Sequence, residues 1–337
     1  MAKKYSKNEF NKILKKINLK YNIFGPVLKS GKDFNLGKNL IIYDEITDIN
    51  QLEWKEKSTF SPKDILYPPS QVCFNFSSDK FSEPVFDDKP VLIFLRACDI
   101  CGIENLDSMF LENGGRKDFY YSQYRKKCKF ILIECNESFE NCFCVSLKGN
   151  RTSNYSIGVK FHDTEIFASV NDEEFESYFK DGILCDYSPE FINSNKRKID
   201  IPDFVNAGKI YYFDMWRKYD TECVACGRCN AVCISCSCFA TNDVFYADNP
   251  SEGKRIRTWV GCHNNDFTVM AGGLKFRREN GERMRYKALH KVHDFKKKFG
   301  RNMCVGCGRC DDNCHNKIEF FDVLKNMISV YKSLSGH

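Results

Sequence analysis

Two short cysteine runs constrain this chain more than any other feature of its sequence. The first, CVACGRCNAVCISCSC, spans residues 223–238, and the second, CVGCGRCDDNC, spans residues 304–314. In each run, the first four cysteines have the spacing C-x2-C-x2-C-x3-C. Short turns between the first three cysteines keep their sulfurs pointing inward, toward three corners of one cluster, so a fourth corner needs a more distant residue. The chain must therefore bring distant parts of itself together.

This spacing is typical of two-cluster ferredoxins, in which the fourth cysteine of each run ligates the other [4Fe–4S] cluster. The competing interpretation is zinc. A zinc site takes four ligands as two separated pairs and has no use for three evenly spaced cysteines plus a fourth, twice over. We therefore predict two [4Fe–4S] clusters. The first has the ligands Cys223, Cys226, Cys229 and Cys314, and the second has Cys304, Cys307, Cys310 and Cys233.

Two details of the runs concern their local structure. Gly227 and Gly308 follow the second cysteine of each run, where a side chain would crowd a cluster. Proline normally follows the fourth cysteine of such a run, but Ile234 and His315 occupy these positions. Proline shapes the exit of the chain and is not a ligand. We therefore expect cluster binding to survive, with altered local hydrogen bonding.

The first run contains more thiols than one cluster requires. Cys236 and Cys238 are surplus to the four-cysteine spacing. Either they act beside a cluster without binding iron, or Cys236 replaces Cys233 as the remote ligand. Cys262 is a weaker candidate for the same replacement. We keep Cys233 as the predicted ligand.

A further group of cysteines belongs to a strand–helix–strand pattern. VLIFLRAC (91–98) and KFILIEC (129–135) indicate buried strands, and residues 101–115 indicate a helix between them. This order predicts a right-handed crossover and a parallel strand pair. Sites in parallel sheets assemble at the carboxyl ends of neighbouring strands. Cys98 and Cys135 stand at these ends.

More cysteines follow the same strands. Cys142 and Cys144 lie in a short loop, and Cys101 opens the intervening helix. Cysteine is often a small core residue, but cysteines so close to polar residues at strand ends fit a core poorly. We therefore predict a third [4Fe–4S] cluster with Cys101 as a reserve ligand. The preferred ligands are Cys98, Cys135, Cys142 and Cys144, whereas the isolated Cys73, Cys128 and Cys185 are interpreted as structural.

Hydrophobic periodicity predicts an α+β protein. Residues 5–20 form an amphipathic pattern in which Ser6 and Glu9 fit a capping box. Prolines make residues 52–90 a loop-rich connection. The expected divisions are an N-terminal helix and loop-rich segment (1–90) packing on an α/β domain with a partly parallel sheet (91–205), followed by a mostly helical dicluster ferredoxin-like domain (206–337) with a long insert (239–303).

Composition favours a cytoplasmic protein. Hydrophobic residues make up 42% and charged residues 28% of the 337 residues, as in ordinary folded proteins. The longest apolar runs are too short to cross a bilayer, and no apolar segment follows the positive N-terminus. In a reducing cytosol, 19 cysteines point to metal or redox chemistry rather than to disulfides.

The insert between the cysteine runs is strongly basic. Residues 254–301 contain 14 Lys and Arg against 4 Asp and Glu. Such a patch can bind nucleic acid, but no recognisable nucleic-acid module accompanies it. We favour a docking surface for an acidic redox partner together with compensation of cluster charge, ahead of a plain solvated surface. We therefore expect neither nucleic acid nor a membrane as a partner.

Several long segments resemble the iron–sulfur electron-transfer component of the anaerobic sulfite reductases. They are CVACGRCNAVCISCSCF, FTVMAGGLKFRRENGERMRYKALHKVHDFKKKFG and MCVGCGRCDDNC, with RACDICGIENLD and ENCFCVSLKG similar to the N-terminal parts. The resemblance runs from about residue 90 to residue 320. Related proteins are the beta subunits of soluble nickel–iron hydrogenases. The resemblance implies an electron-transfer subunit that passes electrons from an NADH-oxidising flavin subunit to a sirohaem subunit, which reduces sulfite to sulfide.

The residues themselves agree with such a role. The sequence has no glycine-rich dinucleotide fingerprint and no nucleophile–base constellation, and Gly272–Gly273 alone is too weak a signal. We therefore predict no catalytic residue. Two alternatives stay open: the equivalent subunit of a nickel–iron hydrogenase, and a zinc-stabilised nucleic-acid-binding protein that uses the basic insert.

Overall fold

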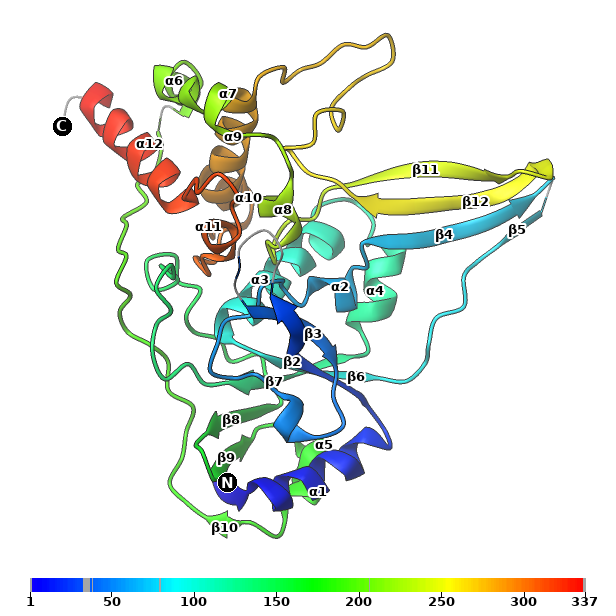
Figure 1. The fold of residues 1–337 in the computed structure, drawn as a ribbon, viewed down its shortest axis with the longest axis vertical. Helices are drawn as coiled ribbons and strands as arrows, with labels where there is room; N and C mark the ends of the chain where they lie inside the picture. Colours follow the sequence, from blue (N-terminus) through cyan, green and yellow to red (C-terminus); the bar gives the residue numbers. More distant parts are fainter. Residues whose placement is uncertain (1, 33–36, 38, 79, 206, 336–337) are drawn as a thin grey trace.

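A mixed β-sheet organises the N-terminal half of the protein. The computed structural model describes residues 2–32, 37, 39–78, 80–205 and 207–335, and within them this sheet has eight strands in the order β10-β1-β9-β8-β7-β6-β2-β3 (Figure 1). Its strands are β1 (Ala2–Ser6), β2 (Asn22–Lys32), β3 (Asn39–Glu45), β6 (Val91–Leu95), β7 (Cys128–Ile133), β8 (Ile157–Phe161), β9 (Glu165–Val170) and β10 (Ile183–Leu184).

The centre of the sheet is parallel, as the sequence predicts. Strands β2, β6, β7 and β8 pair in parallel, and the outer strands pair antiparallel. Helix α3 (Ala97–Asp107), extended by the π-helical segment η2 (Ser108–Glu112), connects β6 to β7. Strand β6 is apolar without alternation because Leu92 and Phe94 enter one core while Ile93 and Leu95 enter another. Both faces of the sheet are therefore covered.

The N-terminal helix forms where its pattern predicts it. Helix α1 (Lys7–Asn18) begins at a capping box in which Ser6 and Glu9 satisfy each other's backbone N–H groups. Its apolar side chains, among them Phe10 and Ile17, pack into the first core with Tyr5. Shorter helical segments complete this half: η1 (Ile49–Gln51), α2 (Lys63–Leu66), α4 (Phe119–Arg125), α5 (Glu173–Glu176) and η3 (Ser177–Phe179).

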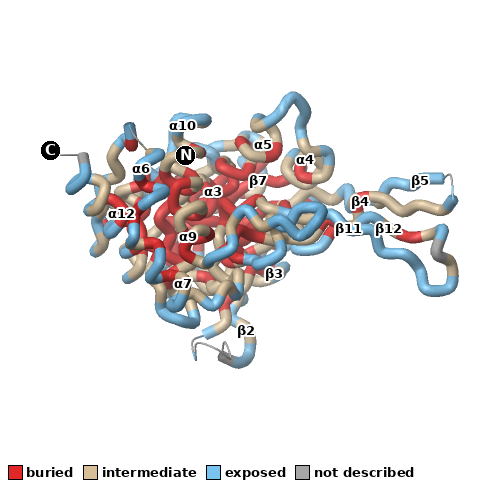
Figure 2. The backbone as a smooth tube through the Cα atoms, turned by 90° about the horizontal axis from the view of Figure 1, so that it is seen from above, coloured by how far each residue is buried: buried red, intermediate tan, exposed pale blue. Residues whose placement is uncertain are grey.

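A second sheet joins segments that are far apart in the sequence. It is antiparallel, with the order β11-β12-β4-β5, and extends from the body as an arm (Figures 1 and 2). Its strands are β4 (Ser70–Ser77), β5 (Lys80–Ser82), β11 (Phe239–Tyr246) and β12 (Asn249–Trp259). The loop-rich connection expected over 52–90 therefore carries strands. The mostly helical character expected of 206–337 is not confirmed, because the insert opens with β11 and β12.

The remaining C-terminal elements are helical and share one core. They are α6 (Ala207–Ile210), η4 (Asp214–Trp216), α7 (Lys218–Glu222), α8 (Arg228–Ala231), α9 (Asn280–Leu289), η5 (His290–Asp294), α10 (Phe295–Phe299), α11 (Arg309–Asp312) and α12 (Phe320–Ser335). Trp216, Met284 and Leu324 are central to this core. The three-part domain division stays a prediction. Among the described residues, no helix is both long and apolar enough to span a membrane.

The C-terminal part packs closely on α3 at Gly102. An ideal Cβ on Gly102 would lie 2.3 Å from Cγ2 of Ile234, a fully buried residue of the first cysteine run. We therefore predict that Gly102→Ala lowers the free energy of unfolding by about 1–3 kcal/mol through overpacking. Anaerobic denaturant unfolding measures this effect. Gly208→Ala is the control, because no atom lies within 4 Å of its ideal Cβ; an equal loss in both variants would contradict the prediction.

Candidate iron–sulfur sites

The two cysteine runs adopt the same local backbone. Ala225 and Gly306, each two residues after the first cysteine, have φ of 53° and 67°. Left-handed residues of this kind turn backbone N–H groups toward a common centre. The N–H of Ala225 donates to Sγ of Cys223 at 3.4 Å, and the N–H of Gly306 opposes the effect of burial on the pKa of Cys304. Each run therefore presents its first sulfur to a backbone donor.

In each run, a second left-handed residue, this time always a glycine, precedes a short helix. Gly227 and Gly308 have φ of 74° and 69° and begin α8 and α11. An ideal Cβ on Gly308 would lie 2.2 Å from the carbonyl oxygen of Asn141, and one on Gly306 would lie 2.7 Å from the backbone of Cys144. These glycines therefore admit the loop that carries Cys142 and Cys144, a close approach that the spacing of the runs does not reveal.

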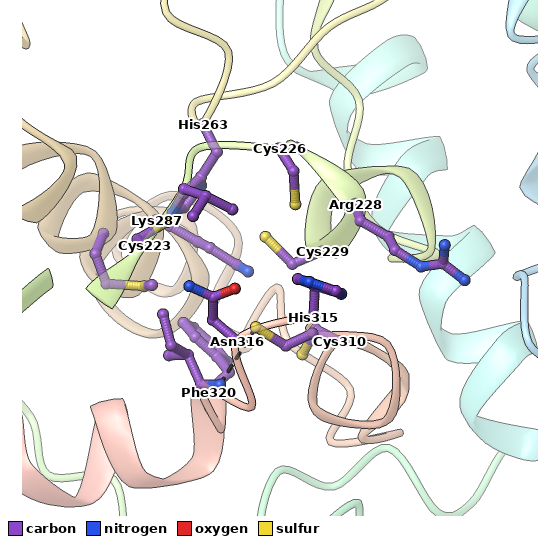
Figure 3. Close-up of a pocket in the computed structure, with 15 residues that line it drawn as sticks. Cys223, Cys226, Arg228, Cys229, His263, Lys287, Cys310, His315, Asn316 and Phe320 are labelled. Atoms are coloured by element: carbon purple, nitrogen blue, oxygen red, sulfur yellow. Dashed lines mark hydrogen bonds between the residues drawn. The ribbon is translucent and has the colours of Figure 1, made fainter. Parts of the chain in front are cut away.

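The four thiols predicted for the first cluster line one cavity, here called the first thiol site (Figure 3). The cavity has a volume of about 30 Å³. The cysteines that line it are Cys223, Cys226, Cys229, Cys314 and additionally Cys310. The backbone N–H of Ile318 donates to Sγ of Cys314 at 3.2 Å. Cys226 is exposed, so this site lies near the protein surface.

A buried lysine of α9 places a positive charge beside the first thiol site. Lys287 is only 4% exposed and lines the same cavity. Burial alone would lower its pKa, but the neighbouring thiols of Cys229 and Cys310 hold that pKa well above its ordinary value. A cation in this position balances the negative charge of thiolate ligands.

The thiols predicted for the second cluster also lie together, and we call them the second thiol site: Cys304, Cys307, Cys310 and Cys233. Burial raises the pKa of Cys304 to about 12, and the charge of Cys233 acts in the same direction. Cys233 has the same effect on Cys307 and Cys310. Cys233 is thus within electrostatic reach of all three thiols of the second run.

Cys233 also has the environment of a thiolate. A hydrogen bond from Cys236, aided by Lys291, outweighs burial and holds the pKa of Cys233 well below its usual value. Nζ of Lys291 lies 3.4 Å from its sulfur. The sulfur of Cys233 therefore lies beside a buried cation and within electrostatic reach of the second run.

The surplus thiols gather around a buried asparagine. Nδ2 of Asn230 lies 3.6 Å from Sγ of Cys236 and 3.3 Å from Sγ of Cys262. Cys238 is near enough to Cys262 to raise the pKa of that thiol, after the larger effect of burial. Two surplus thiols, those of Cys236 and Cys262, therefore contact Asn230, and Cys238 lies near Cys262.

A third thiol site forms at the carboxyl ends of β6 and β7, where the topology predicts it. Its members are Cys98, Cys135, Cys142 and Cys144. Burial raises the pKa of Cys142 to about 11 and that of Cys144 to about 12, and Cys135 adds to both shifts. Cys144 likewise adds to the raised pKa of Cys98, after burial, Asp99 and Cys307. Each of the four thiols is therefore within electrostatic reach of at least one other.

Polar groups contact three sulfurs of the third thiol site. Nη1 of Arg96 donates to Cys135 at 3.4 Å, and Nδ2 of Asn195 donates to Cys144 at 3.6 Å. Nζ of Lys57 lies 4.0 Å from the sulfur of Cys142. The reserve candidate, Cys101, instead donates its thiol hydrogen to the carbonyl of Arg151 at 3.3 Å. These contacts favour the preferred set without Cys101.

The isolated cysteines lie elsewhere. Cys128 is buried in the second core and donates to the carbonyl of Tyr124 at 3.3 Å. Cys73 is a buried residue of β4, and Cys185 follows β10. None of them contributes to the three thiol sites as these are defined above, which agrees with their interpretation as structural residues.

The three thiol sites are contiguous. Cys310 belongs to the second site and also lines the cavity of the first. The thiol of Cys142 donates to the carbonyl of Cys307 at 3.4 Å, and Cys307 raises the pKa of Cys98 and Cys144. The second thiol site is thus in contact with both of the others and lies between them in space.

The donor sets fit clusters better than single ions. Across the part of the chain that the structure describes, no three His, Cys, Asp or Glu side chains converge closely enough to hold one metal ion. Zinc requires four ligands around a single point. A [4Fe–4S] cluster instead binds each thiolate through a different iron, so its ligands surround a volume. The cavity of the first thiol site has this character, and zinc ligation is not supported.

A buried ion pair joins the second and third thiol sites. Arg309, between Cys307 and Cys310, donates to both carboxylate oxygens of Asp99 at 2.5 and 3.1 Å. The two side chains are 1% and 0% exposed. Arg309 also donates to the carbonyl and the hydroxyl of Ser58. Because Asp99 adjoins Cys98, this pair fixes the second cysteine run against α3.

The functional side chains that sequence reasoning missed are mostly cations. The basic insert was interpreted as a docking surface together with compensation of cluster charge, without naming residues. Two of its lysines, Lys287 and Lys291, are buried beside the thiol sites. The residues in contact with thiols or ion-paired beside them are Lys57, Arg96, Lys287, Lys291 and Arg309. Only the excess of positive charge near the cysteines pointed to them, and that excess does not say which residues turn inward.

Comparison with known protein families first identifies the class of domain that contains the cysteine runs. Residues 222–318 match the family described as a 4Fe-4S dicluster domain. This range contains both cysteine runs. The protein therefore carries an iron–sulfur domain of the two-cluster type.

A relative narrows the comparison further. The chain is 29% identical over 306 residues to sulfhydrogenase 2 subunit beta of Pyrococcus furiosus, and the match covers 84% of this chain and 87% of the relative. No solved structure matches the chain. The protein is thus a distant homologue of a hydrogenase-type beta subunit.

The buried pair gives a prediction about stability. Asp99→Asn leaves the Arg309 guanidinium buried without a counter-charge, so the free energy of unfolding is expected to fall by about 3–5 kcal/mol. Anaerobic denaturant unfolding, followed by the far-UV circular dichroism signal, measures this loss.

A surface pair provides the matched control. Lys55 and Asp163 also form an ion pair, at 3.0 Å, but their side chains are 63% and 85% exposed. Asp163→Asn is expected to leave the unfolding midpoint unchanged, because solvent screens such pairs. Equal midpoints for Asp99→Asn and Asp163→Asn would show that the buried pair does not anchor the second run.

Proposed function

We propose that this chain is an electron-transfer subunit of an oxidoreductase complex and that it holds three [4Fe–4S] clusters. The observation that carries the proposal is the contiguity of three four-cysteine sites, linked through Cys310 and Cys307. When bound, a [4Fe–4S] cluster supplies reversible one-electron chemistry. The chain's own residues hold the clusters and exclude water from the inner sites.

The proposed ligands follow the three thiol sites. The first cluster takes Cys223, Cys226, Cys229 and Cys314, the second Cys304, Cys307, Cys310 and Cys233, and the third Cys98, Cys135, Cys142 and Cys144. Burial opposes ionisation of most of these thiols, so nearby donors must stabilise their anions. The buried cations described above and the backbone N–H groups near Cys223 and Cys314 provide this stabilisation.

The first thiol site is the proposed point of electron exchange with a partner. Cys226 is exposed, and the neighbouring Val224 is 59% exposed. In the second site Cys307 is only 8% exposed, and its other three cysteines are less exposed than Cys226. A partner that docks over Val224 therefore approaches the first cluster before the others.

Two terminal partners are supported by different observations. The relative named sulfhydrogenase 2 subunit beta matches along most of this chain and supports a hydrogenase. The resemblance of the cysteine runs and of the insert segment to the iron–sulfur component of the anaerobic sulfite reductases supports a sirohaem partner that reduces sulfite to sulfide. For the sulfite-reducing complex, the proposed electron donor is a flavin-bearing subunit that oxidises NADH. A cytoplasmic location stays a prediction.

Anaerobic co-purification distinguishes these partners. A co-purifying subunit with nickel supports the hydrogenase, and one with the absorption of sirohaem supports sulfite reduction. A colourless chain that contains zinc, without iron or acid-labile sulfide, would refute the electron-transfer proposal altogether.

The third cluster gives a prediction about iron content. Three cubanes correspond to about twelve irons per chain, and two correspond to about eight. The double substitution Cys142→Ser and Cys144→Ser is expected to remove about four irons, because it takes two thiolates from the third site only. Iron and sulfide analysis of anaerobically purified protein measures this loss.

Two single substitutions serve as controls. Cys185→Ser and Cys101→Ser are expected to retain all the iron, because neither residue belongs to a proposed ligand set. If the double variant keeps the wild-type iron content, the third cluster is wrong, while the two clusters of the ferredoxin-type runs remain supported.

A further inference from the structure

One buried lysine contacts both halves of the second thiol site. Lys291 lies in η5, within the insert that separates the two cysteine runs, and it is 3% exposed. Its Nζ donates to Sγ of Cys233 at 3.4 Å and to the hydroxyl of Ser235 at 2.9 Å. Its carbonyl accepts the backbone N–H groups of Met303 and Cys304 at 2.9 and 3.1 Å. The residue therefore joins the remote ligand to the run that it completes.

The π-helical turn makes the carbonyl contacts available. In a continuous α-helix, the carbonyl of Lys291 would accept the N–H of Phe295. Here the N–H of Phe295 donates to the carbonyl of His290 instead, which is the π-helical pattern. The carbonyl of Lys291 is thereby left for the N–H groups at the start of the second run. Single π-turns of this kind are frequent at functional sites.

The side chain of Lys291 is enclosed by groups of the second thiol site. Its Nζ lies against the sulfur of Cys233, and its carbonyl accepts the N–H of Cys304. The anions that compensate this cation thus belong to the cysteine sites. A charge held in this way acts strongly on nearby groups, because water does not screen it.

A second lysine stands one helical turn earlier and faces the neighbouring site. Lys287 and Lys291 are four residues apart, so they project from the same face of the helix. Lys287 lies beside Cys229 of the first thiol site. The helix therefore delivers one buried cation to each of the two ferredoxin-type sites.

We propose that Lys291 sets the reduction potential of the cluster at the second thiol site, and that Lys287 does the same at the first. The inference rests on the proposed electron-transfer function. Reduction adds one negative charge to a cluster, and a cation at a ligand sulfur favours the reduced state. Lys291 acts through Cys233 and is thus a positioning residue for the electron-transfer reaction.

Substitutions at Lys291 separate charge from packing. Lys291→Gln keeps a hydrogen-bond donor and removes the charge, whereas Lys291→Arg keeps the charge. The measurement is an anaerobic redox titration followed by electron paramagnetic resonance, together with iron analysis. Lys291→Gln is expected to retain the iron and to disfavour reduction of one cluster about tenfold, which lowers its midpoint potential by about 59 mV for one electron. Lys291→Arg is expected to keep the wild-type potential.

Two further variants test the assignment to individual sites. Lys287→Gln is expected to lower the potential of a different cluster from the one that Lys291→Gln affects. Lys297→Gln removes an exposed charge from the same helical segment and is expected to leave every potential unchanged. A shift of equal size in Lys297→Gln would show a general charge effect and overturn the proposal.

The remaining outcomes are also decisive. Unchanged potentials in Lys291→Gln, with iron retained, overturn the proposal for Lys291, and an equal shift in Lys291→Arg attributes the effect to packing and overturns it as well. If Lys291→Gln fails to assemble its cluster, Lys287→Gln carries the test, and unchanged potentials there overturn the proposal. Wild-type protein with fewer than about eight irons would instead refute the cluster assignment, so the two failures are distinguishable.

Discussion

The buried contact between Arg309 and Asp99 determines how the cysteine-rich region sits on the sheet. Both charges are almost entirely excluded from solvent, so neither is tolerated without the other. Asp99 is next to Cys98, and Arg309 stands between Cys307 and Cys310. One ion pair therefore sets the position of the second thiol site relative to the third. The three thiol sites are contiguous only because the second is held in this position. Electron transfer between clusters requires such neighbouring sites.

Close packing also holds the two cysteine runs against the N-terminal half of the protein. It explains why one residue departs from the usual ferredoxin pattern. Ile234 occupies the position where proline normally follows the fourth cysteine, and its side chain is fully buried against Gly102. An apolar side chain at this point packs the first run onto α3, which proline would do less extensively. On the other side, Gly306 and Gly308 admit the backbone of residues 141–144. Both runs thus pack against the N-terminal half of the protein, which contains the third thiol site.

The sequence predicts local geometry and strand-end topology well, because both depend on short-range rules. The parallel β6–β7 pair, which the structure shows, brings the strand ends before Cys98 and Cys135 to one edge of the sheet. The grouping of Cys233 with the second run as a ligand set stays a prediction. The arm is different. Strand β4 pairs with β12, so Gln71 faces Arg257, and no local pattern encodes a partner so distant in the chain. The inward direction of Lys291 likewise depends on a π-turn that periodicity does not reveal.

The buried lysines change the meaning of the basic insert. Arg257, Arg283, Lys287 and Lys291 are each 4% exposed or less, so a substantial part of the positive charge faces the interior. Charges in such positions are weakly screened by salt. Lys287 and Lys291 act on the cysteine sites, whereas Arg257 is ion-paired with Asp118. Compensation of cluster charge thus has a basis in Lys287 and Lys291, while docking through the other basic residues of the insert stays a prediction. The exposed Cys226 and its neighbour Val224 offer a second, apolar surface to the proposed partner. Apolar contacts over the first site would make association less sensitive to ionic strength than a basic docking patch would.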